Sequence, residues 1–261
     1  MQFHLLARPR RWWVSLIELA LVAALFFGLL TAAVALLSAT GDDADVLELL
    51  SLALVLPAPF LAAWLTRRNP NALLSVEYRI RWPIVGRAAL VAVPLYGLLA
   101  GIMFFSAEAV VTAHTIALAC VYLLIIPFQA AMEELVFRAA LPQIVGTWVR
   151  SPWGAYGAAI PPFVFLHVYN WIGLTDIFVF AICAAYLTWR TGGIEAATVL
   201  HAAGNLQIYL LIPFFPDDLT VTTDLDWGSV AFTIALTVLA TALIARVVTR
   251  SRAVSNVYRV G

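Results

Sequence analysis

The stretch Ala131-Met132-Glu133-Glu134-Leu135-Val136-Phe137-Arg138 puts two carboxylates and a guanidinium into a sequence that is otherwise almost continuously apolar. A charged side chain at bilayer depth costs roughly 2.5–3.5 kcal/mol, so it usually persists because it pairs, faces a wet cavity or carries function. On a helix, Glu134 and Arg138 share one face, with the acid first, and should pair. Glu133 is rotated by about 100° from Glu134 and has no basic neighbour three or four positions away. We therefore expect Glu133 to be chemically free and this stretch to carry the chemistry.

The composition excludes an ordinary soluble domain. Apolar residues make up 63% of the chain and charged residues 11%, with a mean hydropathy of +0.95, whereas soluble domains have about 45–50% and about 25%. At 261 residues, the chain has room for about six to nine spanning helices of about 20 residues each, and for no second soluble domain. Residues 1–261 are therefore expected to form a single integral membrane domain, an all-α polytopic bundle of about eight transmembrane helices.

The apolar runs predict eight helices, at Val14–Leu37, Val46–Leu65, Gly86–Phe105, Ile116–Met132, Trp153–Tyr169, Ile177–Trp189, Ile194–Phe214 and Ser229–Val248. The sixth is short for a span. The fifth contains Pro161-Pro162, which favours a kink or a partly re-entrant path. If the fourth helix ended at Met132, Glu133 would lie at the membrane boundary. A continuation towards Val149, kinked at Pro142, would instead bring Glu133 near the middle of a long tilted helix.

The charges separate along the chain according to the predicted loops. All fifteen basic residues are arginine, which suggests a GC-rich genome and favours a bacterial plasma membrane. Cytoplasmic loops are enriched in basic residues, and with the N-terminus inside they receive Arg8, Arg10, Arg11, Arg67, Arg68, Arg79, Arg81, Arg87, Arg150, Arg190, Arg246, Arg250, Arg252 and Arg259. The opposite face receives Asp42, Asp43, Asp45, Glu48, Glu108, Asp176, Asp217, Asp218, Asp224 and Asp226. The pattern predicts a multi-pass protein of the cell membrane with both termini cytoplasmic.

Two other features lie near the predicted cytoplasmic face. Residues 66–87 form a sizeable loop with a basic and aromatic segment, which we expect to lie on the anionic headgroups of the lipid bilayer. Glu18 and Glu195 fall in predicted helices close to the same face, where a carboxylate can reach headgroups or water. We therefore leave both acids out of the candidate site.

Two further helices carry polar groups that do not belong in lipid. The fifth contains His167, and the seventh contains His201 and Asn205, which are four residues apart and share a helix face. Alone, a histidine or asparagine inside a bundle is more often an interhelical hydrogen-bonding residue than a catalytic one. Together with the adjacent acids Glu133 and Glu134, these residues predict one shared site that opens towards the cytoplasmic half of the bundle.

Three motifs in this order closely resemble those of the CPBP intramembrane proteases, a family that includes the CAAX prenyl endopeptidases and the bacteriocin-processing or immunity (Abi) proteins. They are Glu-Glu-x-x-x-Arg (Glu133, Glu134, Arg138), Phe-x-x-x-His (Phe163, His167) and His-x-x-x-Asn (His201, Asn205). Each motif alone is weak, but all three in order at membrane depth are specific. The resemblance covers residues 116–212, including Thr191-Gly192-Gly193, and implies that this catalytic core hydrolyses a peptide bond within the membrane.

The resemblance lets the motif residues be given roles on chemical grounds. Glu133, unpaired and buried, suits a general base that takes a proton from water. His167 would hold that water and pass the proton to the leaving amine. His201 and Asn205, as donors on one face, suit an oxyanion hole for the tetrahedral intermediate.

The remaining motif residues have a supporting role. Glu134 and Arg138 would form a pair that orients the neighbouring carboxylate and binds the substrate backbone. The expected substrate is a peptide or a membrane-anchored protein, and nothing in the sequence indicates nucleic acid as a partner. Prenylated CAAX proteins are not the expected targets if the chain is bacterial. No cofactor is required by this mechanism.

Three alternatives stay open. Glu133, His167 and His201 could act as zinc ligands with room for water, which would make the protein a zinc-dependent metalloprotease. Against zinc, the sequence lacks His-Glu-x-x-His, and asparagine is a poor ligand for this metal. The chain could also be a non-catalytic immunity or chaperone-like membrane protein, although a dead homologue should lose costly polar residues. A proton-coupled transporter would normally show two related halves, which are not visible.

Overall fold

The computed structural model describes residues 2–38, 44–106, 108–215 and 223–249. Within these ranges the chain folds into helices joined by turns and loops, and the only β-type pairing is one isolated bridge between Ser75 and Gly193. The main helices are α1 (Trp12–Leu37), α2 (Ala44–Leu54), α3 (Pro57–Leu65), α4 (Trp82–Phe105), α5 (Ala113–Glu134), α6 (Leu141–Val145), α7 (Pro152–Gly157), α8 (Ile160–Phe165), α9 (Trp171–Thr191), α10 (Glu195–Tyr209) and α11 (Trp227–Thr249). Short helical turns are η1 (Phe3–Leu5), η2 (Pro70–Leu73), η3 (Leu135–Ala140) and η4 (Ile212–Phe214).

Seven segments are long and apolar enough to cross a membrane. They are Trp12–Leu37, Ala44–Leu65, Trp82–Phe105, Ala113–Val145, Trp171–Thr191, Glu195–Phe214 and Trp227–Val248. Large apolar side chains on these helices point away from the protein, among them Leu90, Phe105 and Leu124, which are 75%, 86% and 68% exposed. Apolar surface of this extent marks a membrane-facing side. The predicted all-α, multi-pass membrane bundle is therefore confirmed.

The fifth predicted helix, Trp153–Tyr169, is not a continuous span. It forms α7 and α8, which are separated at Ala158–Ala159, immediately before Pro161-Pro162. Proline lacks the backbone N–H that a continuing helix needs but is tolerated in a first turn, so a new helix begins there. This pair still carries the chain from one end of the bundle to the other, because Arg150 contacts His4 while Asn170 bonds to Thr223. The chain thus makes eight passages, and the fifth is interrupted, as predicted.

The sixth predicted helix is longer than expected. Its apolar run was predicted at Ile177–Trp189, but α9 has 21 residues, Trp171–Thr191. The extra turns contain Thr175 and Asp176, which are polar and therefore do not belong to the apolar run from which the helix was predicted. The Asn170 side chain caps the start by accepting from the Gly173 N–H, and Gly192 ends the helix with a left-handed φ of 70°.

The fourth span is one continuous rod from Ala113 to Val145, in which Glu133 lies twenty residues after the start and twelve before the end. Its π-helical part, η3, lies directly before α6, in which Pro142 occupies the first turn. Proline cannot donate to the preceding turn and collides with the carbonyl four residues earlier. The wider π-turn, in which the Leu141 N–H bonds to the Val136 carbonyl, accommodates this. The continuation past Met132 is confirmed, and a π-turn takes the place of the kink expected at Pro142.

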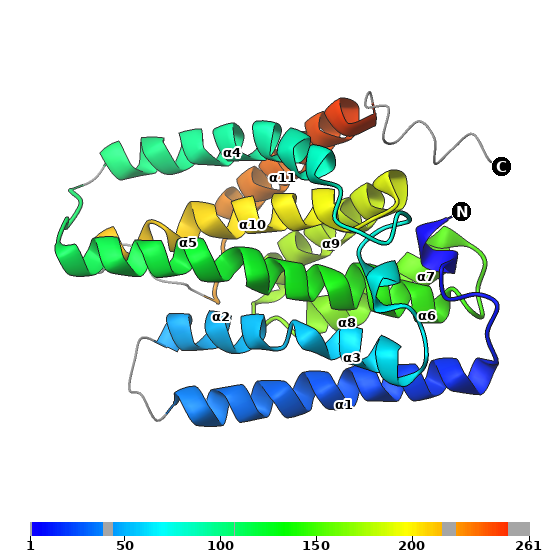
Figure 1. The fold of residues 1–261 in the computed structure, drawn as a ribbon. Helices are drawn as coiled ribbons and strands as arrows, with labels where there is room; N and C mark the ends of the chain where they lie inside the picture. Colours follow the sequence, from blue (N-terminus) through cyan, green and yellow to red (C-terminus); the bar gives the residue numbers. More distant parts are fainter. Residues whose placement is uncertain (1, 39–43, 107, 216–222, 250–261) are drawn as a thin grey trace.

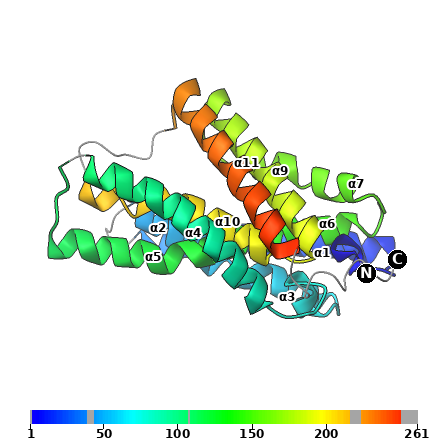
Figure 2. The ribbon, with the colours of Figure 1, turned by 90° about the horizontal axis from the view of Figure 1, so that it is seen from above.

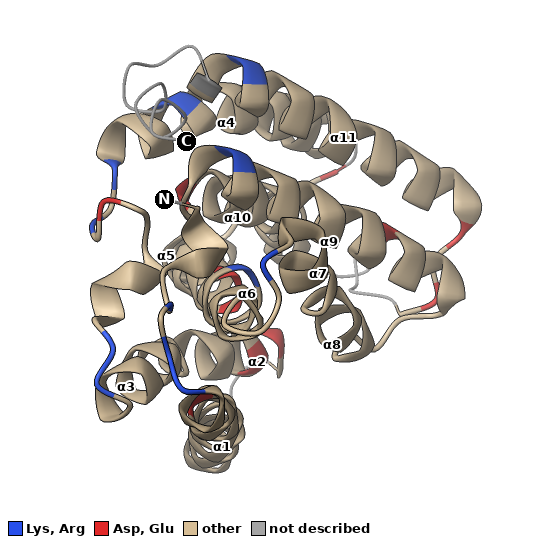
Figure 3. Cartoon of the chain, turned by 90° about the vertical axis from the view of Figure 1, so that its right-hand side faces the viewer, with Lys and Arg blue, Asp and Glu red and all other residues tan. Residues whose placement is uncertain are grey.

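The long helices lie side by side, with α9 and α11 packed together and inclined to the rest (Figures 1 and 2). One apolar core joins α1, α3, η3, α8 and α9, and a second joins α4, α9, α10 and α11. Arginines occupy the loops at the end where η1 lies, as the view onto that end shows (Figure 3). We call it the arginine end. The acids Asp45, Glu108 and Asp224 lie at the opposite end, where Val110 bonds to Phe214.

Two acids near the arginine end were predicted to reach water, and this was wrong. Glu18 is fully buried and accepts from both Arg10 and Arg68. Glu195 is 4% exposed and binds Arg81, which is 3% exposed. Arginines of the loop turn inward and cover these carboxylates, so neither acid needs solvent. The same contacts mean that residues 66–87 pack partly against protein rather than lying wholly on headgroups.

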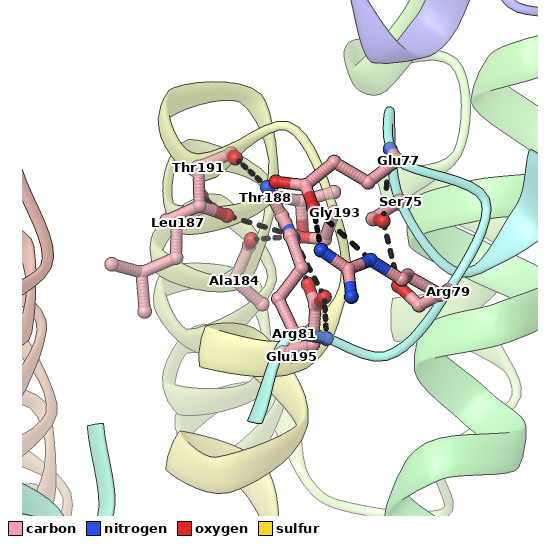
Figure 4. A network of polar contacts seen from close by, with 10 residues as sticks. All are labelled: Ser75, Glu77, Arg79, Arg81, Ala184, Leu187, Thr188, Thr191, Gly193 and Glu195. Carbon is pink, nitrogen blue, oxygen red and sulfur yellow. Dashed lines mark hydrogen bonds and ion pairs between the residues drawn. The ribbon is translucent and has the colours of Figure 1, made fainter. Parts of the chain in front are cut away.

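The contact between Arg81, which precedes α4, and Glu195, the first residue of α10, forms a clamp (Figure 4). The Arg81 Nε and Nη2 donate to the two Glu195 carboxylate oxygens at 2.8 and 2.7 Å, and Nη1 donates to the Thr191 carbonyl at 2.7 Å. Ser75 pairs with Gly193 in the isolated bridge beside it. A Cβ at Gly193 would collide with the side chains of Arg81, Glu195 and Ser75, so only glycine permits this approach. The clamp fixes the start of α10.

Candidate active site

A chain of polar contacts joins the end of α5 to the middle of α10. The Gln129 Nε2 donates to Glu133 Oε1 at 2.6 Å, and the Asn205 Nδ2 donates to Gln129 Oε1 at 3.1 Å. Gln129 and Glu133 are 3% and 7% exposed. Since residues four apart lie on one helix face, the local geometry of α5 aims both side chains at α10. One glutamine amide therefore holds the carboxylate and the asparagine in register.

His201 lies between the two glutamates. Its Nδ1 is 2.9 Å from Glu134 Oε1, and its Nε2 is 3.8 Å from Glu133 Oε2. Glu134 also lies 3.4 Å, between Oε2 and Nε, from Arg138. All four side chains are at least nine-tenths buried. The predicted pairing of Glu134 with Arg138 is present, but the shorter contact of Glu134 is to His201.

Arg138 lies against aromatic rings. Its guanidinium carbon is 3.9 Å from the centre of the Phe163 ring and 5.5 Å from that of Phe180, an arrangement that stabilises a buried cation. Its two terminal nitrogens are buried and make no hydrogen bond within the described residues. Arg138 therefore keeps unsatisfied donors next to the two glutamates.

His167 lies just beyond the C-terminal end of α8. Its ring packs on Phe163 at 4.7 Å, and the same Phe163 ring contacts His201 at 6.4 Å. The His167 Nδ1 lies 2.7 Å from the Phe163 carbonyl oxygen. A carbonyl only accepts, so Nδ1 carries the proton, and Nε2 of the neutral ring is the acceptor. His167 is thus connected to His201 through the Phe163 ring, and no described carboxylate forms a hydrogen bond or ion pair with the His167 ring.

The structure brings five of the six predicted site residues into one connected group: Glu133, Glu134, Arg138, His201 and Asn205. His167 joins it only through Phe163. The expectation that Glu133 is free was wrong at one oxygen, because Gln129 supplies a donor from the same helix. Gln129 was missed, although an amide four residues before Glu133 in an apolar run could have indicated it. Whether the site opens towards the cytoplasm stays a prediction.

The zinc alternative can be compared with the donors that are present. Within the described ranges, no group of three or more histidine, cysteine, aspartate or glutamate side chains is arranged to hold a metal ion. Glu133 and His201 lie close together, whereas His167 contacts the Phe163 ring, which in turn contacts His201. Glu133, His167 and His201 are therefore not arranged as a three-ligand zinc site in this structure.

One comparison with known proteins gives a match. Residues 112–207 match the family model described as type II CAAX prenyl endopeptidase Rce1-like. The matched segment runs from the residue that caps α5 into α10, and all six predicted site residues fall within it. No curated protein and no solved structure gives a match.

Proposed function

Since the chain belongs, through residues 112–207, to the CPBP family of membrane-embedded CAAX-type endopeptidases, we propose that it cleaves a peptide bond with a water molecule activated by Glu133. One observation carries the proposal. Glu133 Oε2 is buried, has no hydrogen-bond partner among the described residues, and lies 3.8 Å from His201 Nε2. That separation is too long for a direct hydrogen bond, and it leaves both atoms available to a water or a substrate carbonyl. The other oxygen, Oε1, is held by Gln129, so the carboxylate is oriented.

The histidines take different parts in the proton transfer. The His167 Nε2 is an acceptor, because Nδ1 donates to the Phe163 carbonyl, so His167 can take a proton and deliver it to the leaving amine. The His201 Nδ1–H donates a hydrogen bond to Glu134 Oε1 when that carboxylate is ionised. Its Nε2 can then donate to an oxyanion only from the doubly protonated ring. An oxyanion role for His201 therefore requires imidazolium, whereas Asn205 donates in any state.

The buried donors of Arg138 suit a peptide substrate. Its terminal nitrogens lack partners among the described residues while Nε faces Glu134. An unsatisfied buried donor costs about 1–3 kcal/mol, and more when charged. A substrate carbonyl or carboxylate placed there would remove this penalty on binding. Arg138 would then hold the substrate backbone beside Glu133, and Glu134 would keep the guanidinium in place.

A cleavage assay with the purified protein in lipid nanodiscs tests the reaction. The substrates are a quenched fluorescent peptide with a farnesylated cysteine three residues from its end, the same peptide without the farnesyl group, and a single-span membrane protein. We expect wild-type protein to cleave at least one, and Glu133→Gln to be slower by about 100-fold or more, since a general base contributes about 10²–10⁴-fold. Glu108→Gln, an exposed acid at the far end, serves as the matched control. If wild-type protein cleaves none of the three, the non-catalytic alternative is favoured.

The same assay separates the two enzymatic mechanisms. Cleavage with water activated by Glu133 alone should continue in the presence of a strong chelator. A zinc-dependent enzyme should lose activity to the chelator and regain it when zinc is added. Recovery with zinc would replace the glutamate mechanism by the metal mechanism, and the ligand set would then be sought at Glu133, His167 and His201.

A further inference from the structure

A cavity lies at the arginine end, away from the candidate active site. It has a volume of about 390 Å³ and is lined by Arg8, Pro9, Arg10, Thr147 and Arg150. This volume falls within the range of small-molecule sites, about 300–1,000 Å³. Three of the five lining residues are arginines and none is an acid.

The walls of the cavity are held together by contacts between distant parts of the chain. The buried His4 ring donates from Nε2 to the Arg150 carbonyl at 3.0 Å, and the Arg8 Nε donates to the Gly146 carbonyl. These contacts attach the N-terminal segment to the connection between α6 and α7. The cavity is thus formed by the fold and does not depend on a loose terminus.

The arginines around the cavity are only partly used by the protein. Arg10 donates to Glu18 and to the Thr66 carbonyl. The Glu18 carboxylate, which pairs with Arg10, also pairs with Arg68. The terminal nitrogens of Arg8 and the whole guanidinium of Arg150 have no partner among the described residues. Burial lowers the pKa of His4, and the charge of Arg8 lowers it further, which disfavours a positive charge on this ring. A strong excess of positive charge faces the cavity.

The position of the cavity points to the membrane surface. Arg8 and Arg10 directly precede the first candidate span, and Thr147 and Arg150 directly follow the fourth, at the same end of the bundle. Exposed tryptophans lie next to these residues in the chain, namely Trp12, Trp13, Trp148 and Trp153, which are 64%, 44%, 40% and 81% exposed. Tryptophan is enriched at the level of the headgroups. The cavity is therefore at the depth where lipid phosphates lie.

We propose that this cavity binds the phosphate group of an anionic membrane lipid, with Arg8 and Arg150 as the main ligands. Guanidinium groups donate several hydrogen bonds in a planar fork that fits phosphate oxygens. Basic pockets between membrane helices near the surface are suited to anionic headgroups. The acyl chains would extend along the apolar surface beside α1. The site is separate from the proposed catalytic residues, so the proposal does not depend on the protease mechanism.

Native mass spectrometry of the purified protein with phosphatidylglycerol tests the site, with phosphatidylcholine as the neutral comparison. We expect wild-type protein to retain phosphatidylglycerol in preference to phosphatidylcholine. The variants Arg150→Gln and Arg8→Gln should bind phosphatidylglycerol at least about 10-fold more weakly, since each removes a charge-assisted hydrogen bond. Arg150→Gln is the cleaner variant, because within the described residues Arg150 is bonded through its backbone carbonyl and not through its side chain. Arg79→Gln removes an equal charge from an exposed arginine of the same end and should retain the lipid.

Two results would overturn the proposal. If Arg79→Gln weakens lipid binding as much as Arg150→Gln does, the attraction comes from the whole arginine surface and not from the cavity. If inorganic phosphate alone stabilises the wild-type protein against heat as much as phosphatidylglycerol does, and Arg150→Gln removes that effect, the cavity binds a free anion and not a lipid. Loss of lipid confined to the cavity variants, with no stabilisation by inorganic phosphate, supports the site as described.

Discussion

Glu134 has two buried partners, so its loss would affect both. Arg138 and His201 each approach one of its oxygens, and all three side chains lie in the interior. Removing one partner of a buried ion pair costs about 3–5 kcal/mol, because the other charge is left unpaired. We expect Glu134→Gln to lower the thermal unfolding temperature of the purified protein clearly, and activity to fall with it.

The control for this change is Glu77→Gln. Glu77 pairs with Arg79, whose side chain is 73% exposed, and such surface pairs contribute about 0–1 kcal/mol. Its unfolding temperature should therefore stay close to that of the wild type. The roles assigned to the two glutamates would be reversed by two results together. Glu134→Gln would have a wild-type unfolding temperature but no cleavage activity, and Glu133→Gln would remain active.

Gln129 gives a second prediction at the scale of the residue. Its amide orients Glu133 and accepts from Asn205, so Gln129→Leu should release both. A hydrogen bond to a charged group contributes about 1.5–3 kcal/mol, which corresponds to a fall of about 10- to 100-fold in kcat/KM. The stability should change less than the rate. Steady-state cleavage kinetics measure the effect.

The matched control for Gln129 is Gln207→Leu. Gln207 is also a buried glutamine, 8% exposed, but among the described residues its side chain bonds only to the Met103 sulfur and not to the proposed catalytic residues. Its loss should leave kcat/KM near the wild-type value. Equal losses in the two variants would mean that Gln129 acts through general packing and not through Glu133.

The polar residues could be located from the sequence, but their partners could not. The cost of charge in lipid singles out Glu133, Glu134 and Arg138 in any apolar run. The spacing within one helix then predicts the pair of Glu134 with Arg138, which is present. The closer contact, from His201 to Glu134, joins residues 67 positions apart in the chain. No periodicity within one helix contains such a contact. Glu133 was wrongly expected to be free for another reason, because Gln129, four positions before it on the same helix, was overlooked.

At the scale of the elements, the π-turn and the clamp shape the site. The π-turn in η3 follows Glu134 directly and carries Arg138, and insertions of this kind are frequent at functional sites. The sequence shows that Pro142 must interrupt the regular hydrogen bonds of the helix. It does not show whether the helix accommodates this proline by a kink or by a wider turn. The ion pairs of Glu18 and Glu195 could not be predicted from the sequence either, because the arginines that bind them come from other parts of the chain.

The clamp between Arg81 and Glu195 yields a prediction about α10. Glu195 opens the helix that carries His201 and Asn205, and Arg81 binds both of its carboxylate oxygens. Arg81→Met should strand a buried carboxylate and lower stability by about 3–5 kcal/mol. The double variant Arg81→Met/Glu195→Met removes both charges and should recover much of this loss. Thermal unfolding of the single and double variants, with Arg79→Met as the exposed control, measures the coupling.

The clamp should also affect catalysis. If it sets the position of α10, the double variant should regain stability without regaining full kcat. A double variant that recovers both equally would show that the clamp stabilises the bundle but does not position the site. Failure of the double variant to recover any stability would mean that the pair is not coupled as the distances indicate.

At the scale of the whole molecule, composition was sufficient for the fold class. A chain with 63% apolar residues must place much of that surface in lipid, and the predicted spans follow from length alone. The interrupted passage was also foreseen, since Pro161-Pro162 excludes a continuous helix. The additional N-terminal turns of α9 were not predicted, because Thr175 and Asp176 are polar and the sequence does not show the neighbouring helix against which they lie.

The last prediction concerns orientation. The arginines within the described ranges, apart from Arg138, gather around one end of the bundle (Figure 3), and basic residues favour the cytoplasmic side. The arginine end should therefore be cytoplasmic. Glu133 lies twelve residues before Val145, the arginine-end terminus of its span, and twenty residues after Ala113. At 1.5 Å per residue these are about 18 Å and about 30 Å along the helix, so the site would be nearer the cytoplasm.

Cysteine labelling in intact cells tests this orientation. In a background with Cys120 and Cys183 replaced by alanine, single cysteines are placed at Arg79 and Glu108, which are exposed at opposite ends. A membrane-impermeant maleimide should label Glu108→Cys in intact cells, and Arg79→Cys only after permeabilisation. The reverse pattern would put the arginine end outside. Since Glu133 is closer to that end, the same result would also move the proposed substrate from the cytoplasmic to the outer side of the membrane.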